Sequence, residues 1–470
     1  MTILPFNPTD HESAEALRAF LLQCRETARQ DGCAKLVSIS LAVEAFDPLA
    51  VLESIFEQDE RHFYAERPSI ASAIAGADAV LSHDAHGPER FVSVQQFIDN
   101  TLAHTIAVGD VAAPFGGPHF FTSFAFQDVI ELGEPFPAAR VFVPRWQVAR
   151  AGDVTTAVAN LVVTPDADLD ALAARVWRAH VKFKNFSFAA ASMSVGSPSL
   201  FQKHETGDYR AAVARALERI ASGEFQKIVL ARALDVSARA PLHPLRLLNG
   251  LRQRFPDCYS FSLADGAGHS LIGASPERLV RVSQGVLETE ALAGSARRGA
   301  GASEDAALAA GLLASEKDRH EQRLVLDSIV RRLAPLGLRL EFAEQPGVRR
   351  LANVQHLHTP VRAALPEDVR LLEALARLHP TPAVGGSPRA SAVACIRELE
   401  GFPRGLYAGA LGWVNARGGG EFFVGIRSAL VHGATARVYA GAGIVAGSTP
   451  EKEFAETELK FNAILDALLA

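Results

Sequence analysis

The chain has 470 residues, of which 48% are hydrophobic and 21% charged, and its formal net charge is −6. This composition is typical of a globular protein with a sizeable core, and it lacks the basic profile of a nucleic-acid-binding protein. The four cysteines show no C-x-x-C spacing, which fits a reducing compartment. Since we find neither a signal-peptide pattern nor an apolar run long enough for a bilayer, we expect a cytoplasmic protein.

The first 200 residues carry mixed helix and strand patterns without a cluster of catalytic residue types. The pattern predicts helices over 12–30 and 168–181 and strands over 35–43, 62–67, 120–126, 140–144 and 155–163. Loop chemistry at 195–200 marks the expected end of this part. We therefore interpret residues 1–200 as a scaffold subdomain.

Residues 201–470 are expected to form the catalytic region. The pattern predicts helices over 208–222 and 304–333 and strands over 225–232, 270–274, 278–282, 405–413, 421–429 and 436–440. Long helices with antiparallel-looking strands, and no regular alternation of strand and helix, favour an α+β fold over a doubly wound sheet.

Two acidic helical stretches each place two carboxylates three residues apart. The pairs are Asp318 with Glu321 and Glu453 with Glu456, and this spacing puts each pair on one helix face. Magnesium prefers hard oxygen ligands, usually one or two carboxylates with waters and an anionic substrate. The pairs therefore predict a magnesium site, with two solvated helix faces as the alternative.

A literal G-x-G-x-x-A pattern occurs at 441–446, between an expected strand and an expected helix. A dinucleotide site needs a second parallel strand with an acidic residue about twenty positions on. The helix that follows this pattern runs to the end of the chain, so we reject nucleotide binding. We instead expect backbone N–H groups beside Gly441 and Gly443 to bind a carboxylate.

Several charged residues stand in apolar surroundings. Lys227 lies in an expected strand, where loss of hydration suits an amine to act as a base. Glu277 lies in a turn between two strands, where partial burial would let it donate a proton. Arg427, inside an expected apolar strand, fits a carboxylate partner, and Lys460 lies one turn beyond Glu456. A solvent-exposed lysine, an exposed turn residue and a structural ion pair are the respective alternatives.

The chain resembles the chorismate-utilising enzymes, and within them the isochorismate synthases. The motifs that carry this resemblance lie at 226–232, 273–278, 292–298, 316–321, 354–357, 379–386, 404–409, 425–427, 441–444 and 453–460. Weaker matches at 36–40 and 63–68 look like the menaquinone and plant type. The resemblance implies a single large α+β fold with two layered antiparallel sheets, flanking helices and a central cleft.

The resemblance also implies a reaction and a set of site residues. Magnesium would be held by Glu321 and Glu456, with Asp318 and Glu453 holding its waters. Lys227 would deprotonate the water that attacks C2 of chorismate, and Glu277 would protonate the leaving C4 hydroxyl. The expected substrate-binding residues are Gly294, Ser295, His356, Ala383, Tyr407, Arg427, Gly441, Gly443 and Lys460.

The site residues indicate which reaction of this family the chain is expected to catalyse. Aminating members of the family, which resemble anthranilate synthase, typically have glutamine where Lys227 stands, and the aminodeoxychorismate type has a nucleophilic lysine where Ala293 stands. Salicylate synthase, which also eliminates pyruvate, remains the close alternative, and Ala383 with Val384 argues modestly against it. A non-catalytic chorismate-binding protein and a metal-dependent hydrolase are the alternatives from other classes. We expect a monomer that serves menaquinone synthesis, with no nucleic-acid or membrane partner.

Overall fold

The computed structural model describes residues 1–4, 14–55, 60–184, 200–351 and 354–469. The predicted boundary loop therefore falls outside the described residues, except for Leu200. None of the described helices combines the length and the apolar character needed to cross a bilayer.

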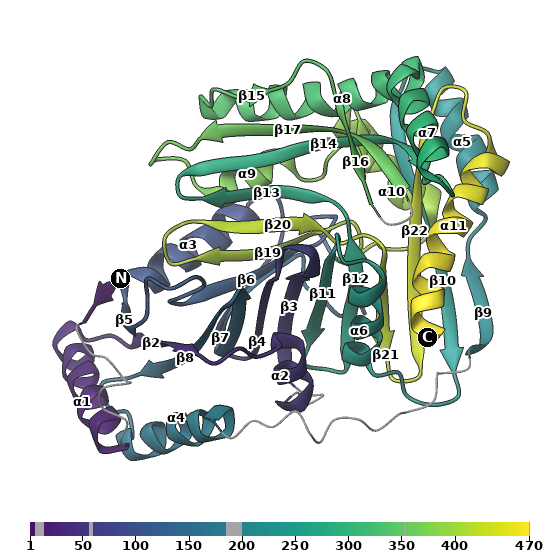
Figure 1. The fold of residues 1–470 in the computed structure, drawn as a ribbon. Coiled ribbons are helices and arrows are strands. Elements are labelled where there is room, and N and C mark those ends of the chain that lie inside the picture. The colour runs from purple at the N-terminus through teal and green to yellow at the C-terminus, as the bar shows by residue number, and fades with distance from the viewer. Residues whose placement is uncertain (5–13, 56–59, 185–199, 352–353, 470) are drawn as a thin grey trace.

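Helices and strands follow one another along the whole chain without a separate helical part (Figure 1). The helices are α1 (Ala14–Asp31), α2 (Pro48–Ile55), α3 (Arg90–Ala103), α4 (Leu169–Lys184), α5 (Tyr209–Ala221), α6 (Pro244–Arg254), α7 (Ala302–Ala314), α8 (Glu316–Leu333), α9 (Leu371–Leu378), α10 (Arg389–Glu400) and α11 (Pro450–Leu469). The strands of the first half are β1 (Thr2–Ile3), β2 (Lys35–Val43), β3 (Arg61–Arg67), β4 (Ser72–Ala85), β5 (Thr105–Gly109), β6 (His119–Phe124), β7 (Ala139–Ala151), β8 (Val154–Val163), β9 (Leu200–Thr206) and β10 (Lys227–Ala238). Those of the second half are β11 (Tyr259–Asp265), β12 (His269–Ser275), β13 (Arg278–Ser283), β14 (Val286–Arg297), β15 (Glu341–Phe342), β16 (Gly347–Arg350), β17 (Val354–Ala364), β18 (Gly386–Ser387), β19 (Ala410–Asn415), β20 (Gly420–Val424), β21 (Ser428–His432) and β22 (Thr435–Val445).

The strands form one hydrogen-bonded network that folds back on itself. An unbroken antiparallel path runs β17–β14–β13–β20–β19–β6–β7–β4–β3–β11–β12–β21–β22–β10. Figure 1 shows one end of this path, β14 and β17, across the top, and the other end, β22 and β10, down the right side. The α+β prediction with layered antiparallel strands is confirmed.

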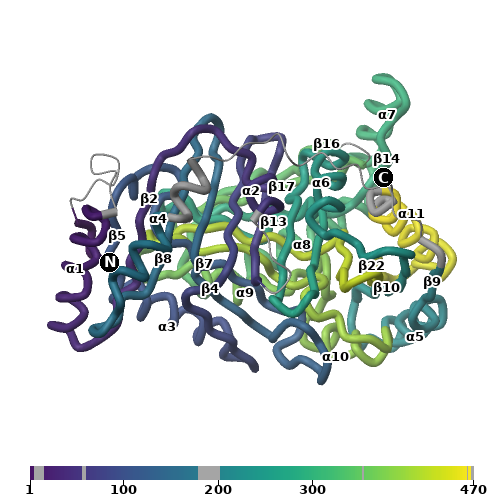
Figure 2. Tube along the Cα trace, turned by 90° about the horizontal axis from the view of Figure 1, so that it is seen from below, coloured from purple at the N-terminus to yellow at the C-terminus, as the bar shows by residue number. Residues whose placement is uncertain are grey.

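Helices cover the outer faces and supply the core. The main apolar cluster packs α3, α5, α8, α9 and α10 against β10, β13 and β14, which are strands from both ends of the path. Figure 2 shows α1 and α4 at one end of the molecule and α5 and α11 at the other. The predicted boundary near residue 200 stays a prediction, and β3–β11 and β6–β19 pair across it.

Several predicted elements are wrong in their bounds. The helix predicted over 304–333 is broken at Ser315, where the backbone is extended. The Ser315 side chain caps the N-terminus of α8 by accepting a hydrogen bond from the Asp318 N–H. The strand predicted from 405 begins at Ala410, because residues 405–408 form a turn with positive φ at Gly405 and Ala408.

Two of these corrections change the expected site. The strand predicted over 421–429 is two strands, and Arg427 lies in the break between them with a φ of 51°. The predicted loop at 441–444 is the continuation of β22, paired with β10 from Lys227 onward. Of the other expected substrate-binding residues, His356 lies in β17.

Candidate active site

A cavity of about 340 Å³ lies between the two ends of the strand path. Its walls come from β10, β14, β17, β22, α8 and α11 and from the turns before β13 and β21. Every site residue expected from the sequence lines it: Lys227, Glu277, Gly294, Ser295, Asp318, Glu321, His356, Ala383, Tyr407, Arg427, Gly441, Gly443, Glu453, Glu456 and Lys460. The structure therefore brings these residues together, while the individual roles stay predictions.

Lys227 is the first residue of β10 and is only 3% exposed. Its ammonium lies 2.6 Å from a carboxylate oxygen of Glu321, which reaches across from α8. Burial is the largest influence and would raise the pKa of Glu321, but the charge and hydrogen bond of Lys227, with the charges of Lys317 and Lys460, together lower this pKa. The amine is thus held in the cavity wall by a carboxylate rather than by solvent.

Glu277 lies in the turn between β12 and β13 and is half-buried. Burial raises the pKa of Glu277 to about 7, and the negative charge of Glu290 acts in the same direction. The Thr381 hydroxyl, 3.4 Å away, and the charge of Lys227 lower this pKa by less. A carboxyl with a pKa near 7 can carry a proton at neutral pH and give it up, which suits a general acid.

Asp318 and Glu321 lie on α8, and Glu453 and Glu456 lie on α11, as the sequence predicts. Burial raises the pKa of the Glu453 carboxyl, and the like charge of Glu456 adds to this. Carboxylates of like charge that face one cavity are hard oxygen donors of the kind magnesium takes, so the residues present fit this ion. Within the described ranges, no three metal-binding side chains already form a cluster.

Arg427 gives the cavity a cation that has no acidic partner among the described residues. Burial lowers the pKa of this guanidinium, and no carboxylate within the described residues forms an ion pair with it. The alternative of an ordinary structural ion pair is therefore wrong for the described part of the chain. Burial also lowers the pKa of His356 to about 4, with a further contribution from Arg427, so its imidazole is neutral. Its Nδ1 lies 2.8 Å from the Ser295 hydroxyl.

Glycines keep three points of the wall free of side chains. A Cβ on Gly443 would lie 3.0 Å from Cε of Lys227, and one on Gly441 would lie 2.9 Å from the Tyr407 hydroxyl. Gly294 has a φ of 74°, and a Cβ there would lie 2.9 Å from Cβ of Asp318. Larger residues at these positions would displace the groups expected to act on the substrate.

Sequence reasoning missed a buried ion pair behind the site. Arg404 donates from Nε to Glu400 at 3.0 Å and from its two terminal nitrogens to the carbonyls of Val384 and Val229, each at 2.8 Å. Glu400 also accepts from the N–H of Ala231 on β10. The pair thus joins the strand of Lys227 to the wall at 383–384, and no local spacing in the sequence indicates these long-range bonds.

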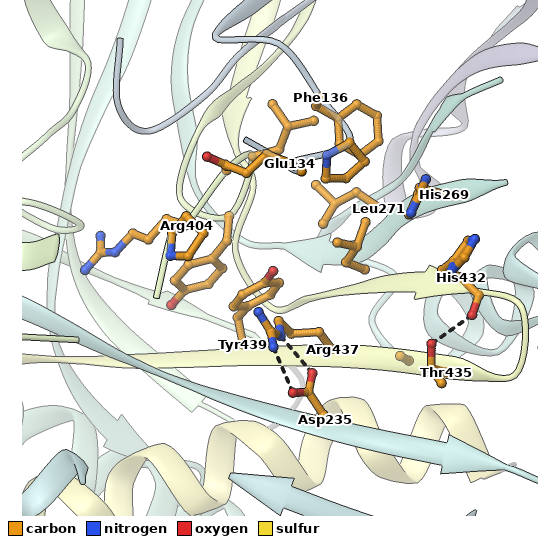
Figure 3. Close-up of a pocket in the computed structure, with 18 of the residues that line it drawn as sticks. Glu134, Phe136, Asp235, His269, Leu271, Arg404, His432, Thr435, Arg437 and Tyr439 are labelled. Atoms are coloured by element: carbon orange, nitrogen blue, oxygen red, sulfur yellow. Dashed lines mark hydrogen bonds and ion pairs between the residues drawn. The ribbon is translucent and has the colours of Figure 1, made fainter. Parts of the chain in front are cut away.

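A second cavity of about 510 Å³ shares Arg404, Tyr407 and Tyr439 with the first (Figure 3). In its wall, Arg437 and Asp235 neutralise each other through two hydrogen bonds that Arg437 donates, at 2.7 and 2.8 Å. The cavity also lacks the acidic pairs of α8 and α11. We therefore place the candidate active site in the first cavity, although the second is larger.

Comparison with known proteins gives a family for the whole chain. Residues 19–469 match the family described as chorismate binding enzyme. The chain is 35% identical over 436 residues to the salicylate biosynthesis isochorismate synthase of Pseudomonas aeruginosa, which covers 93% of this chain and 90% of that protein. It is 30% identical over 460 residues to isochorismate synthase MenF of Bacillus subtilis, covering 96% and 97% of the two chains.

A solved structure shares the fold over nearly the same length. MenF, the menaquinone-specific isochorismate synthase from Escherichia coli, superposes with a TM-score of 0.78 at 27% identity. The match covers 95% of this chain and 100% of that one. The folded-back strand network is thus shared with a protein whose sequence differs at most positions.

Proposed function

Since this chain belongs to the chorismate-binding enzymes, we propose that it converts chorismate to isochorismate in a magnesium-dependent reaction. The observation that carries the proposal is the shared cavity of a buried lysine, a carboxyl whose pKa is raised to about 7, and an arginine without a carboxylate partner among the described residues. These groups are a base, an acid and an anion anchor. The names of the relatives support the same reaction.

Lys227 is the proposed base. Its amine takes a proton from a water molecule, and the oxygen of that water forms a bond to C2 of the ring. The double bonds of the ring shift as the new bond forms, and the C4–oxygen bond breaks. The backbone of Lys227 is fixed by β22, while the missing side chain of Gly443 leaves space beside its Cε.

Glu277 is the proposed acid. It gives its proton to the departing C4 hydroxyl, which leaves as water, so that one water enters and one leaves for each turnover. Glu277 must then regain a proton and Lys227 must lose one before the next cycle. Burial makes the protonated form of Glu277 available near neutral pH, because its pKa is about 7.

The remaining cavity groups bind the two carboxylates of the substrate. Arg427 has no acidic partner in the described part of the chain. It binds the enolpyruvyl carboxylate by donating hydrogen bonds, together with Tyr407. Glu321 and Glu456 would hold magnesium directly, and Asp318 and Glu453 through its waters. When bound, the ion offsets the charge of the substrate and orients its ring carboxylate.

Two wall residues favour this reaction over related ones. The methyl group of Ala293 lines the cavity where a nucleophilic lysine would be needed for the aminodeoxychorismate type. Lys227 occupies the position at which aminating members have glutamine. Salicylate synthase keeps both the lysine and the glutamate, so only the product separates it from the proposed activity.

The test is incubation of the full chain with chorismate and Mg²⁺, followed by chromatography and mass spectrometry. We expect a product of unchanged mass that co-elutes with isochorismate, with no pyruvate and no dependence on ammonia. Release of pyruvate with salicylate would support the alternative, and conversion only in the presence of ammonia would support amination. An unchanged chorismate pool would refute the proposal.

We further propose a cytoplasmic monomer whose product enters menaquinone synthesis. The menaquinone-specific relative of known structure supports this destination, whereas the relative from Pseudomonas aeruginosa is named for salicylate biosynthesis. Deletion of the gene in its own host should lower menaquinone and leave salicylate unchanged; the opposite result would reverse the assignment. Light scattering on the purified chain tests the monomer.

A further inference from the structure

Each of the two carboxylates proposed as direct metal ligands already forms an ion pair with a lysine ammonium. Lys227 on β10 lies 2.6 Å from Glu321 on α8, and Lys460 lies 2.8 Å from Glu456 one turn away on α11. A divalent ion on these oxygens would lie beside two positive charges, which repel it strongly in a partly dehydrated cavity. The ion and the two ammonium groups therefore compete for the same oxygens.

We propose that Lys227 and Lys460 are internal counter-cations that Mg²⁺ displaces on binding, so that metal entry and release of both amines are one exchange. This inference rests on the magnesium requirement of the proposed function. It concerns the state without substrate, in which the lysines neutralise the carboxylates and keep α8 and α11 from repelling each other across the cavity.

The two lysines differ in the hydrogen bonds that remain to them after the exchange. Lys460 also donates a hydrogen bond to the carbonyl of Gly441 at 2.7 Å, so it retains a partner on β22 when Glu456 is taken. The side-chain amine of Lys227 has Glu321 as its only hydrogen-bond partner among the described residues. Its release therefore leaves the amine free in the cavity wall, beside the open space at Gly443.

Burial predicts which lysine competes more strongly. The Lys227 side chain is 3% exposed and Glu321 is 31% exposed, whereas Lys460 and Glu456 are 36% and 52% exposed. Water screens the outer pair and weakens its attraction, whereas the Coulomb attraction between charges is larger where one of them is buried. Removal of the Lys227 charge should thus raise the affinity for Mg²⁺ more than removal of the Lys460 charge.

Titration calorimetry of the full chain with Mg²⁺ alone tests this order. We expect Lys227→Gln to bind Mg²⁺ at least about tenfold more tightly than the unmodified chain, and Lys460→Gln about threefold more tightly. Lys317→Gln is the matched control, because Lys317 also lines the cavity but forms no ion pair within the described residues. It removes the same charge, which acts on Glu321 and Glu453 without an ion pair, and we expect tightening of about twofold or less.

Three results would overturn the exchange. Equal tightening in all three variants would mean that only the general field of the cavity matters, and unchanged or weaker binding in Lys227→Gln and Lys460→Gln would mean that the lysines do not compete. Absence of Mg²⁺ binding in every form would remove the metal itself. If the affinities of the variants are unchanged while the unmodified chain converts chorismate normally, the exchange is refuted and the proposed function stands.

A measurement on the unmodified chain guards against misfolded variants. The chain has only eight lysines, so ¹³Cε-lysine labelling gives a simple NMR spectrum. We expect Mg²⁺ to shift the signals of Lys227 and Lys460 with the same midpoint as the calorimetric titration, and to leave that of Lys317 nearly unmoved. Saturation by Mg²⁺ without movement of the first two signals would refute the proposal.

Discussion

Replacement of Glu277 by glutamine tests the assignment of the acid most directly. Glutamine keeps the size of the side chain but has no acidic proton to give. A positioned general acid typically contributes about 10²–10⁴-fold to the rate, so Glu277→Gln should lose that much kcat with little change in KM. Chromatographic measurement of isochorismate gives both constants.

The magnitude at each pH follows from the pKa of about 7, compared with an ordinary value of 4.5. At pH 7, about half of the Glu277 side chains carry a proton, whereas an ordinary glutamate would be protonated in about 0.3% of molecules. Above pH 7 the protonated fraction falls about tenfold for each pH unit. We therefore expect kcat/KM of the unmodified enzyme to fall along this limb.

The raised pKa of Glu277 also makes the free energy of unfolding depend on pH. The folded state holds the Glu277 proton more tightly than the unfolded chain, so this contribution is complete below pH 4.5 and is lost as pH rises through 7. The loss is at most about 3 kcal/mol, and Glu277→Gln should not show it in urea unfolding at pH 5 and 8. A flat kcat/KM from pH 6.5 to 9, or a fully active Glu277→Gln, would refute the reasoning.

Five further changes test other parts of the site and its support. Lys227→Ala should lower kcat by about 10²–10⁴-fold without unfolding the chain, as circular dichroism can check; normal turnover would exclude it as the base. EDTA should abolish turnover and Mg²⁺ restore it, while Glu456→Gln should need more Mg²⁺; an unchanged titration would exclude that ligand. Arg427→Lys should raise KM for chorismate, because an ammonium lacks the planar fork of a guanidinium, and an unaltered KM would contradict the anchor. Glu400→Gln should cost about 3–5 kcal/mol in urea unfolding, since it leaves the buried Arg404 without its counter-charge; a wild-type midpoint would show that the pair is dispensable.

The sequence by itself determined the chemical inventory of the site. Helical spacing of three placed Asp318 with Glu321 and Glu453 with Glu456, because carboxylates at that spacing share a helix face whatever the fold around them. The alternation of apolar and small polar residues predicted β2 with the bounds that the structure shows, although residues 35–40 are buried on both faces. The turn at Glu277 followed from the strands on either side.

Only the tertiary structure decided how these residues meet. Lys227 and Glu321 are 94 positions apart and lie in contact because the antiparallel path folds back and brings β10 opposite α8. The break at Arg427, the extension of β22 through Gly443 and the Arg404–Glu400 pair all depend on partners distant in the chain. Local periodicity records which face of an element is buried, but not which remote strand will pair with it or where that pairing must stop.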